Sequence, residues 1–280
     1  MSAAPEPPRQ TTRALGQLPP SVLGVGAVNL IGLAAVVAAP GSWPWALGAA
    51  LLGHAWIGAL TLSPRTHRLG PNLVRLAPEH VARGLVAITI DDGPDPRTTP
   101  AVLEILDAHA ATASFFCIGE RVARHPELAR EIVRRGHRVE NHTARHRHDF
   151  ALLGPRRYLA ELAAGQALIE AATGFAPCYF RAPAGVRNPF CWPALQRAGL
   201  VLASWTRRGF DTRDGDAARV LRRLADGLAA GDILLLHDGH CARTPAGVPV
   251  ILEVLPQLLA LLQRRGLRAV ALPRPPGSLR

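Results

Sequence analysis

Two adjacent carboxylates, Asp91 and Asp92, follow an apolar run in the stretch ITIDDGPDPRTTP. Like charges repel, and carboxylates at the edge of an apolar core lose hydration, so such a pair is electrostatically costly. A bound metal cation would offset that cost. Adjacent strand residues point to opposite faces, so both carboxylates can face inward only if the chain turns there. Gly93 and Pro94 follow at once and are suited to that turn.

Two histidines, His142 and His146, form a second candidate group in the stretch ENHTARHRHDF. On a helix or helical turn, this spacing puts both imidazoles on one face, where they can share an ion. The spacing alone is weak evidence in a chain with 11 His, and we interpret His148 as a solvated loop residue. One Asp plus two His make a three-ligand site with open positions for water, the pattern of catalytic zinc. Cobalt, nickel or manganese could bind the same divalent-metal site.

The elements that must position these residues begin at residue 85, where apolar runs alternate with helical patterns. We expect strands at 85–90, 112–118, 137–142, 178–183, 200–205, 232–237 and 267–272. Apolar residues at helical spacing predict helices at 99–110, 126–136, 155–174, 189–199, 217–230 and 247–266. This alternation indicates an α/β fold with a parallel sheet. About seven strands, without a dinucleotide-binding Gly motif, favour a distorted (β/α) barrel over an open sheet.

The carboxyl ends of the strands carry the active site in a parallel barrel. The polar residues at or just after the expected strand ends are Asp91, Asp92, His142, His146, Arg181, Asp211 and His237. Their gathering at one rim predicts a site. For Arg181 and Asp211, an ordinary surface ion pair is the alternative interpretation.

The N-terminal part of the chain is apolar and lacks the strand–helix alternation. Residues 21–39 carry no charge and are long enough to cross a bilayer, and residues 46–62 form a second uncharged span that contains His54. The turn PGSWPW between them has two Trp, which favour the membrane interface. A cleaved signal peptide is the alternative, and the second span argues against it. We predict a disordered tail at 1–20, a transmembrane hairpin at 21–62, a linker at 63–84 and a catalytic domain at 85–280.

The positions of the basic residues predict which side of the membrane the domain occupies. Two spans return the chain to its starting side. The tail carries Arg9 and Arg13, the linker carries Arg65, Arg68 and Arg75, and the turn carries no charge. Positive residues near span ends stay cytoplasmic. We therefore expect a multi-pass protein of a bacterial inner membrane with a cytoplasmic catalytic domain.

Composition gives weaker guidance about partners. The formal net charge is +11, and all 32 basic residues are Arg. A basic chain favours anionic partners, although a GC-rich coding bias produces the same composition. No nucleic-acid-binding motif or run of stacking aromatics accompanies the charge, so we expect no nucleic-acid partner. The four Cys form no C-x-x-C pair and are interpreted as small core residues.

Four ordered motifs resemble those of the polysaccharide deacetylase family, carbohydrate esterase family four, also called the NodB homology domain. The family's T-F-D-D-G-P is matched by TIDDGP, H-[ST]-x-x-H by HTARH, R-x-P-x-G by RAPAG, and L-x-H by LLH. Its Asp- and Trp-containing motif is met only in part, because SWTRRGFDTRDGD keeps Trp205 and Asp211 but not the usual spelling. The resemblance spans roughly residues 85 to 272.

The resemblance implies a role for each candidate residue. Asp92, His142 and His146 would bind the metal. Asp91 would be the general base, and Arg181 would orient it. The backbone N–H of Ala184, which stands where the family usually has Tyr, would stabilise the oxyanion. His237 would protonate the leaving amine, with Asp211 holding its ring.

The implied function is metal-dependent removal of an N-acetyl group from an amino sugar in an oligo- or polysaccharide or a lipid-linked glycan. A deformylase or an O-acetyl esterase that acts on a lipid-linked sugar is an alternative within the hydrolases. A non-catalytic, membrane-anchored carbohydrate-binding domain is an alternative from another class. The intact acid pair, the His pair and His237 oppose that last alternative.

Overall fold

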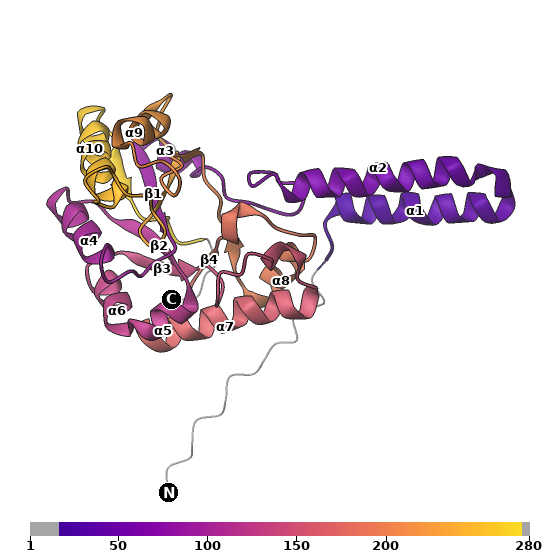
Figure 1. Cartoon of the computed structure of the whole chain (residues 1–280), viewed down its shortest axis with the longest axis horizontal. Helices are drawn as coiled ribbons and strands as arrows, with labels where there is room; N and C mark the ends of the chain where they lie inside the picture. Colours follow the sequence, from indigo (N-terminus) through magenta and orange to yellow (C-terminus); the bar gives the residue numbers. More distant parts are fainter. Residues whose placement is uncertain (1–16, 276–280) are drawn as a thin grey trace, which may run out of the picture.

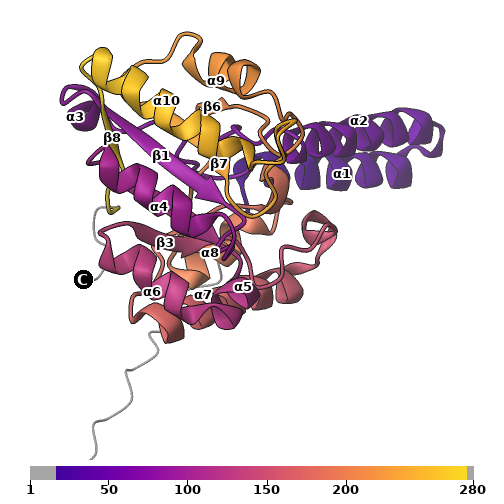
Figure 2. The same cartoon turned by 60° about the vertical axis from the view of Figure 1, so that its left-hand side comes forward.

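A curled parallel sheet with helices packed on its outer face forms the α/β body of the molecule (Figures 1 and 2). The computed structural model describes residues 17–275, so the predicted tail at 1–20 lies almost wholly outside the described residues. The strands are β1 (Leu85–Asp91), β2 (Ala113–Cys117), β3 (Arg138–Asn141), β4 (Tyr179–Phe180), β5 (Val201–Leu202), β6 (Arg207–Arg208), β7 (Ile233–His237) and β8 (Arg268–Val270).

The strands lie in the order β5-β4-β3-β2-β1-β7-β6, and β8 pairs with β1. Every pairing is parallel, which confirms the parallel α/β class. No ladder joins β5 to β6 within the described residues, so the curled sheet stops short of a closed barrel. The sequence pattern did not predict β6, because its two residues are arginines, and it made β4 and β5 too long.

Helices cover the outer face of the sheet (Figure 2). They are α4 (Thr99–Ala108), α5 (Gly119–Arg124), α6 (Pro126–Arg134), α7 (Pro155–Thr173), α8 (Cys191–Ala198), α9 (Ala217–Ala225) and α10 (Val250–Arg264). Prolines stand in the first positions of α4, α6 and α7, where the missing N–H costs no hydrogen bond. Left-handed Gly174 and Gly199 end α7 and α8, a conformation that glycine adopts without strain.

Alternation along β1 divides its side chains between two cores. Val86, Ile88 and Ile90 pack with the outer helices. Leu85 and Ala87 face the interior of the curled sheet instead. The same parity directs Thr89 and Asp91 inward. The strand therefore delivers a carboxylate to the inside of the sheet at its carboxyl end.

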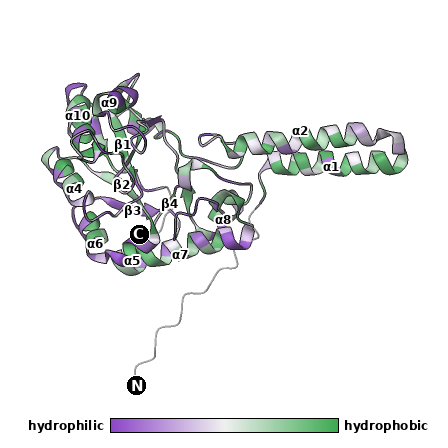
Figure 3. Cartoon of the chain, in the orientation of Figure 1, coloured by the Kyte–Doolittle hydropathy of each residue, from purple (hydrophilic) through white to green (hydrophobic). Residues whose placement is uncertain are grey.

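Two long helices, α1 (Pro20–Ala38) and α2 (Trp43–Thr61), pack side by side and project away from the sheet (Figure 1). A 3-10 turn, Pro40–Ser42, joins them. Figure 3 shows that apolar residues occupy most of this hairpin, including faces that no other element covers. Its exposed large apolar side chains are Leu23, Val28, Leu30, Ile31, Leu33, Val37, Trp43, Trp45, Leu47, Leu51, Leu52 and Trp56. Among the described helices, α1 alone meets the length and hydropathy expected of a membrane span.

The segment between the hairpin and the sheet, residues 63–84, was predicted as a linker, and the structure shows that it packs against the sheet. Leu69 and Leu76 are buried, and Leu73 forms a parallel bridge with Ala203. Arg75 pairs with Asp232 at 2.7 Å. Apolar anchors and backbone hydrogen bonds thus hold this connecting segment, which includes α3 (Pro78–Val81), against the sheet.

Candidate metal centre and active site

Asp91 is fixed at the end of β1 by a buried arginine. Arg181 Nη1 donates to Asp91 Oδ1 at 2.6 Å and to the Thr89 hydroxyl at 2.8 Å. The other guanidinium nitrogens donate to the backbone oxygens of Ala203 and Ser204. Arg181 is only 1% exposed, and all three nitrogens of its guanidinium donate to protein acceptors. A surface ion pair, the alternative considered for Arg181, is therefore wrong.

The chain turns sharply after β1, as the acid pair requires. Asp92 has a positive φ of 73°, which redirects its side chain from the outer face that strand parity would dictate. Gly93 follows in a crowded position, where an added Cβ would lie 2.6 Å from the Asp238 carboxylate. Both carboxylates consequently reach the same cleft.

Asp92, His142 and His146 come together as expected, with one ligand atom from each lying within 4.8 Å of the others. They do so without a helix, which corrects the expectation from their spacing. Residues 142–146 form a loop in which Thr143 and His146 have positive φ values of 67° and 52°. The Thr143 hydroxyl accepts the His146 N–H at 2.8 Å and stabilises this turn. The imidazole rings lie 4.8 Å apart.

The donor chemistry of these side chains fits a cation. His142 Nδ1 lies 2.8 Å from the Arg181 carbonyl oxygen, which can only accept, so the neutral ring donates from Nδ1. Nε2 then presents a lone pair, 3.4 Å from Asp92 Oδ1. That oxygen is buried without a hydrogen-bond partner and also lies 3.2 Å from His146 Nε2. Electron pairs that face one another with no proton between them favour a metal ion at the centre.

The pKa values agree with these charge states. Burial opposes ionisation of Asp92, but its polar contacts with His142 and His240 outweigh burial and hold the pKa of Asp92 well below its usual range. Burial and the neighbouring His142 lower the pKa of His146 to about 4. At neutral pH the site thus contains an ionised carboxylate and a neutral imidazole, the forms that bind metals.

His240 is a site residue that the sequence analysis missed. Its Nδ1 lies 3.2 Å from Asp92 Oδ2, and its Nε2 lies 3.0 Å from Arg121 Nη2. An arginine can only donate, so Nε2 accepts and the proton sits on Nδ1, pointing at Asp92. Arg121 also donates to the Asp92 backbone oxygen at 2.8 Å. The only signal in the sequence was the position of His240, three residues after His237 at the same rim.

A second charged pair lies beside Asp91. The register aligns Asp91 with His237 on β7. Asp211 accepts from the His237 backbone N–H at 2.7 Å and lies 2.9 Å from its Nδ1. Asp211 is 0% exposed, so the surface ion pair considered for it is also wrong. Burial favours the neutral ring, but Asp211 outweighs it and raises the pKa of His237 to about 9.

Ala184 lies in the cleft within a tight turn. Its φ is 54°, and it stands between Pro183 and Gly185. An added Cβ at Gly185 would lie 2.5 Å from Trp205 Cη2 and 2.8 Å from Pro64 Cβ. The turn is therefore clamped between the cleft wall and the start of the connecting segment.

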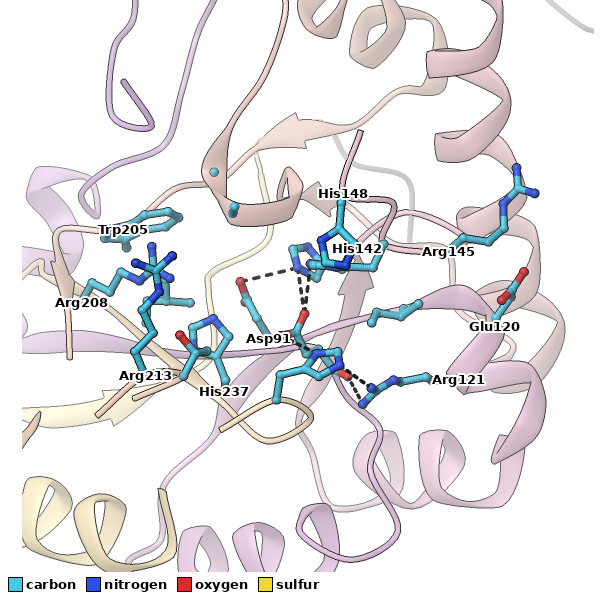
Figure 4. A pocket seen from close by; sticks show the side chains of 18 of the residues that line it. Asp91, Glu120, Arg121, His142, Arg145, His148, Trp205, Arg208, Arg213 and His237 are labelled. Carbon is cyan, nitrogen blue, oxygen red and sulfur yellow. Dashed lines mark hydrogen bonds and ion pairs between the residues drawn. The ribbon is translucent and has the colours of Figure 1, made fainter. Parts of the chain in front are cut away.

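A cleft of about 510 Å³ is lined by both carboxylates of the acid pair, by His142, His146, His237 and His240, and by Ala184 (Figure 4). Asp91 and His142 lie at its centre, with Trp205, Arg208, Arg213 and His237 on one side. This volume is in the range of small-molecule sites and suffices for sugar residues.

Comparisons with known proteins agree with this geometry. A family model described as polysaccharide deacetylase matches residues 79–203. A peptidoglycan-N-acetylglucosamine deacetylase of Bacillus cereus is 34% identical over 176 residues, which cover 62% of this chain and 81% of that protein. A chitooligosaccharide deacetylase of Bradyrhizobium is 36% identical over 200 residues, which cover 68% and 89%. The structure of a family 4 carbohydrate esterase from Streptomyces lividans in complex with acetate has a TM-score of 0.60 at 28% identity and covers 66% of this chain and 91% of that one.

Proposed function

The chain belongs to the polysaccharide deacetylase family, and we propose that it is a metal-dependent hydrolase that removes the N-acetyl group from an amino sugar of a glycan. The observation that carries the proposal is the unpartnered, buried Oδ1 of Asp92, which faces two imidazole nitrogens beside Asp91 and His237.

Asp92, His142 and His146 would hold a divalent cation, and we favour zinc for this nitrogen and oxygen set. The bound cation supplies Lewis acidity, which favours loss of a proton from water and offsets negative charge on the acyl oxygen. Asp91 acts as the general base. Arg181 occupies Asp91 Oδ1, whereas Oδ2 lies 3.9 Å from His142 Nε2, directed toward the metal ligands and available to accept the proton.

His237 acts as the general acid. A pKa of about 9 keeps the ring protonated at neutral pH. Asp211 holds Nδ1, so Nε2 is the nitrogen that faces the cleft with its proton. Water oxygen bonds to the acyl carbon, the carbon–nitrogen bond breaks, and His237 gives its proton to the departing amine. The backbone N–H of Ala184 completes the site by donating to the acyl oxygen as it gains charge.

The same geometry also accommodates a formyl amide or an O-acetyl ester. An alkoxide is a less basic leaving group than an amide anion, so an ester depends less on acid catalysis than either amide does. The raised pKa of His237 therefore favours an amide substrate over an ester.

The hairpin, we propose, anchors the enzyme in a bilayer with both helices spanning. The apolar side chains exposed on α1 and α2 support this, as do Trp43 and Trp45 at the turn between the helices. His54, the polar residue within α2, bonds through Nδ1 to the Ala50 carbonyl oxygen, which reduces the cost of its burial in lipid. The distribution of Arg supports our proposal that the catalytic domain lies on the cytoplasmic side.

Acetate release by the purified, detergent-solubilised full chain tests the function. We expect hydrolysis of N-acetylglucosamine oligomers, its loss on chelation and its recovery with zinc or cobalt. Full activity in a verified metal-free preparation would overturn the proposal.

A further inference from the structure

Two arginines on the His237 side of the cleft lack a carboxylate partner among residues 17–275. Arg208 and Arg213 both line the cleft, and neither forms an ion pair there. The contrast with the neighbouring Arg207 is direct, because that residue bonds to Asp232 at 2.5 Å. Residues 207 and 208 are consecutive on β6, so strand alternation sends one side chain to its acid and the other into the cleft.

The guanidinium of Arg208 is held in place by aromatic rings. It lies 5.5 Å from the ring of Trp205 and 5.1 Å from that of Phe210. Its Nε is buried and has no hydrogen-bond partner. Contact with the two rings restricts the guanidinium, and its N–H groups remain without protein acceptors within the described part of the chain. An arginine held in this way is suited to bind an anion.

Arg213 is exposed on the loop that follows β6, and Figure 4 shows it beside Arg208 and His237. The nearest acid in sequence, Asp214, does not neutralise it. Asp214 bonds to Arg219 at 2.7 Å and to Arg223 at 2.8 Å. A coding bias toward Arg explains how many arginines the chain has, but it does not explain why these two face a cleft without partners.

We infer that Arg208 and Arg213 form an anion subsite that binds the phosphate ester of an amino-sugar phosphate, so that the preferred substrate is a phospho-linked sugar rather than a neutral glycan. This inference rests on the deacetylase function proposed above. Two guanidinium groups match the oxygens of a phosphate, and a neutral N-acetylglucosamine chain offers them no charge.

The position of the subsite indicates what is attached to the other side of the phosphate. Trp205, on which Arg208 stacks, packs against Gly185, and Gly185 also contacts Pro64. Pro64 lies three residues after the end of α2, and the Thr61 carbonyl oxygen accepts a hydrogen bond from the Arg187 N–H. The membrane-proximal base of the hairpin therefore lies against the wall that carries Arg208. A sugar joined to a lipid through phosphate would place its phosphate at this wall and its acyl group at the metal ligands.

Kinetics on three substrates test the subsite: a neutral chitotriose, N-acetylglucosamine 1-phosphate, and a polyprenyl phosphate ester of N-acetylglucosamine. The enzyme is the full chain in detergent. We expect kcat/KM to be at least about tenfold higher for the phosphorylated sugars than for chitotriose. Arg208→Gln and Arg213→Gln should each reduce that preference about tenfold, the order expected for a charge-assisted hydrogen bond. Arg222→Gln, on the exposed face of α9, is the matched control and should leave the preference unchanged.

The two phosphorylated substrates separate the sources of the anion. A preference for the polyprenyl ester over the soluble phosphate supports a lipid-linked substrate, whereas equal values support recognition of the phosphate alone. Chitotriose as the best substrate, or equal damage to all three substrates in both variants, would overturn the subsite.

A binding measurement separates this inference from the function on which it rests. Calorimetry with N-acetylglucosamine 1-phosphate should show binding to the full chain that weakens about tenfold in Arg213→Gln. Binding that depends on Arg213 without any hydrolysis would overturn the deacetylase function and leave the subsite. Hydrolysis of chitotriose without such binding would do the reverse.

Discussion

Replacing Asp211 with Asn should move the alkaline limb of the pH–rate profile, because Asp211 holds the proton of the general acid. The pKa of His237 is raised from 6.5 to about 9. Burial works against this rise, and the Asp211 carboxylate produces it. At roughly 1.4 kcal/mol per pH unit, the change corresponds to about 3 kcal/mol of preference for the imidazolium.

The sign of the effect follows from the role of the ring. A general acid must carry its proton, so kcat falls as the pH rises through the pKa of His237. An imidazole with a pKa of 9 is about nine-tenths protonated at pH 8, and one with a pKa of 6.5 is roughly 3% protonated. Asp211→Asn should therefore slow amide hydrolysis by at least roughly thirtyfold at pH 8, because burial also lowers the pKa of a ring that has lost this carboxylate. Much of the rate should return as the pH falls toward 6. A cation bound to Asp92 would lower the pKa of His237 in both the wild type and Asp211→Asn. The quantity to measure is therefore the difference in pH between the alkaline limbs of the two proteins.

The assay is acetate release from chitotriose between pH 5.5 and 10, with Asp226→Asn, an exposed acid at the end of α9, as the matched control. Metal content should be the same in all three proteins, since Asp211 does not touch the metal ligands. Superimposable alkaline limbs in wild type and Asp211→Asn would refute the assignment of His237 as the acid held by Asp211.

Further variants separate metal binding from proton transfer. His142→Ala should lower metal content, because only two protein ligands would remain. Asp91→Asn should keep its metal and lose about a hundredfold to ten-thousandfold in kcat, since an amide cannot accept the proton; near-wild-type kcat would contradict this. His240→Ala should weaken zinc affinity, measured by chelator competition, about tenfold to a hundredfold, because Asp92 loses the hydrogen bond that orients it. A fluorescent reporter that matures only in the cytoplasm should be bright when it is fused after Arg280. A phosphatase fused at the same place, which is active only after export, should be inactive, and phosphatase activity would contradict the predicted side.

The inward position of the residues at the strand ends was predictable, because side chains along a strand alternate strictly between its two faces. Two-residue alternation through Leu85, Ala87 and Thr89 places Asp91 inside the sheet, and a turn-forming Gly-Pro after Asp92 marks where the alternation breaks. The resemblance then assigned roles that the geometry accommodates, including the contact between Asp211 and His237.

Features that depend on long-range contacts were not predictable. His240 is 55% exposed at its side chain and follows no apolar period, and only its contacts with Asp92 and Arg121 identify it. The connecting segment at 63–84 reads as a linker because its few apolar anchors are widely spaced and its basic residues are many. The loop that holds His142 and His146 depends on the positive φ values of Thr143 and His146, which the pattern of side chains does not predict.

Adjacent carboxylates can lie side by side at the end of β1 because the fold gives each one a different set of partners. Asp91 stays on the inner face of β1, where Arg181 neutralises it and is itself held by backbone oxygens of residues 203 and 204. Asp92 leaves the strand through a positive φ and meets the imidazoles of His142, His146 and His240 instead. Arg181 pairs with one carboxylate, and the imidazoles surround the other as a candidate metal ligand. Two chemically identical neighbours therefore have different surroundings because the backbone turns at Asp92, where φ is 73°. Gly93 follows at a position where a side chain would clash with Asp238.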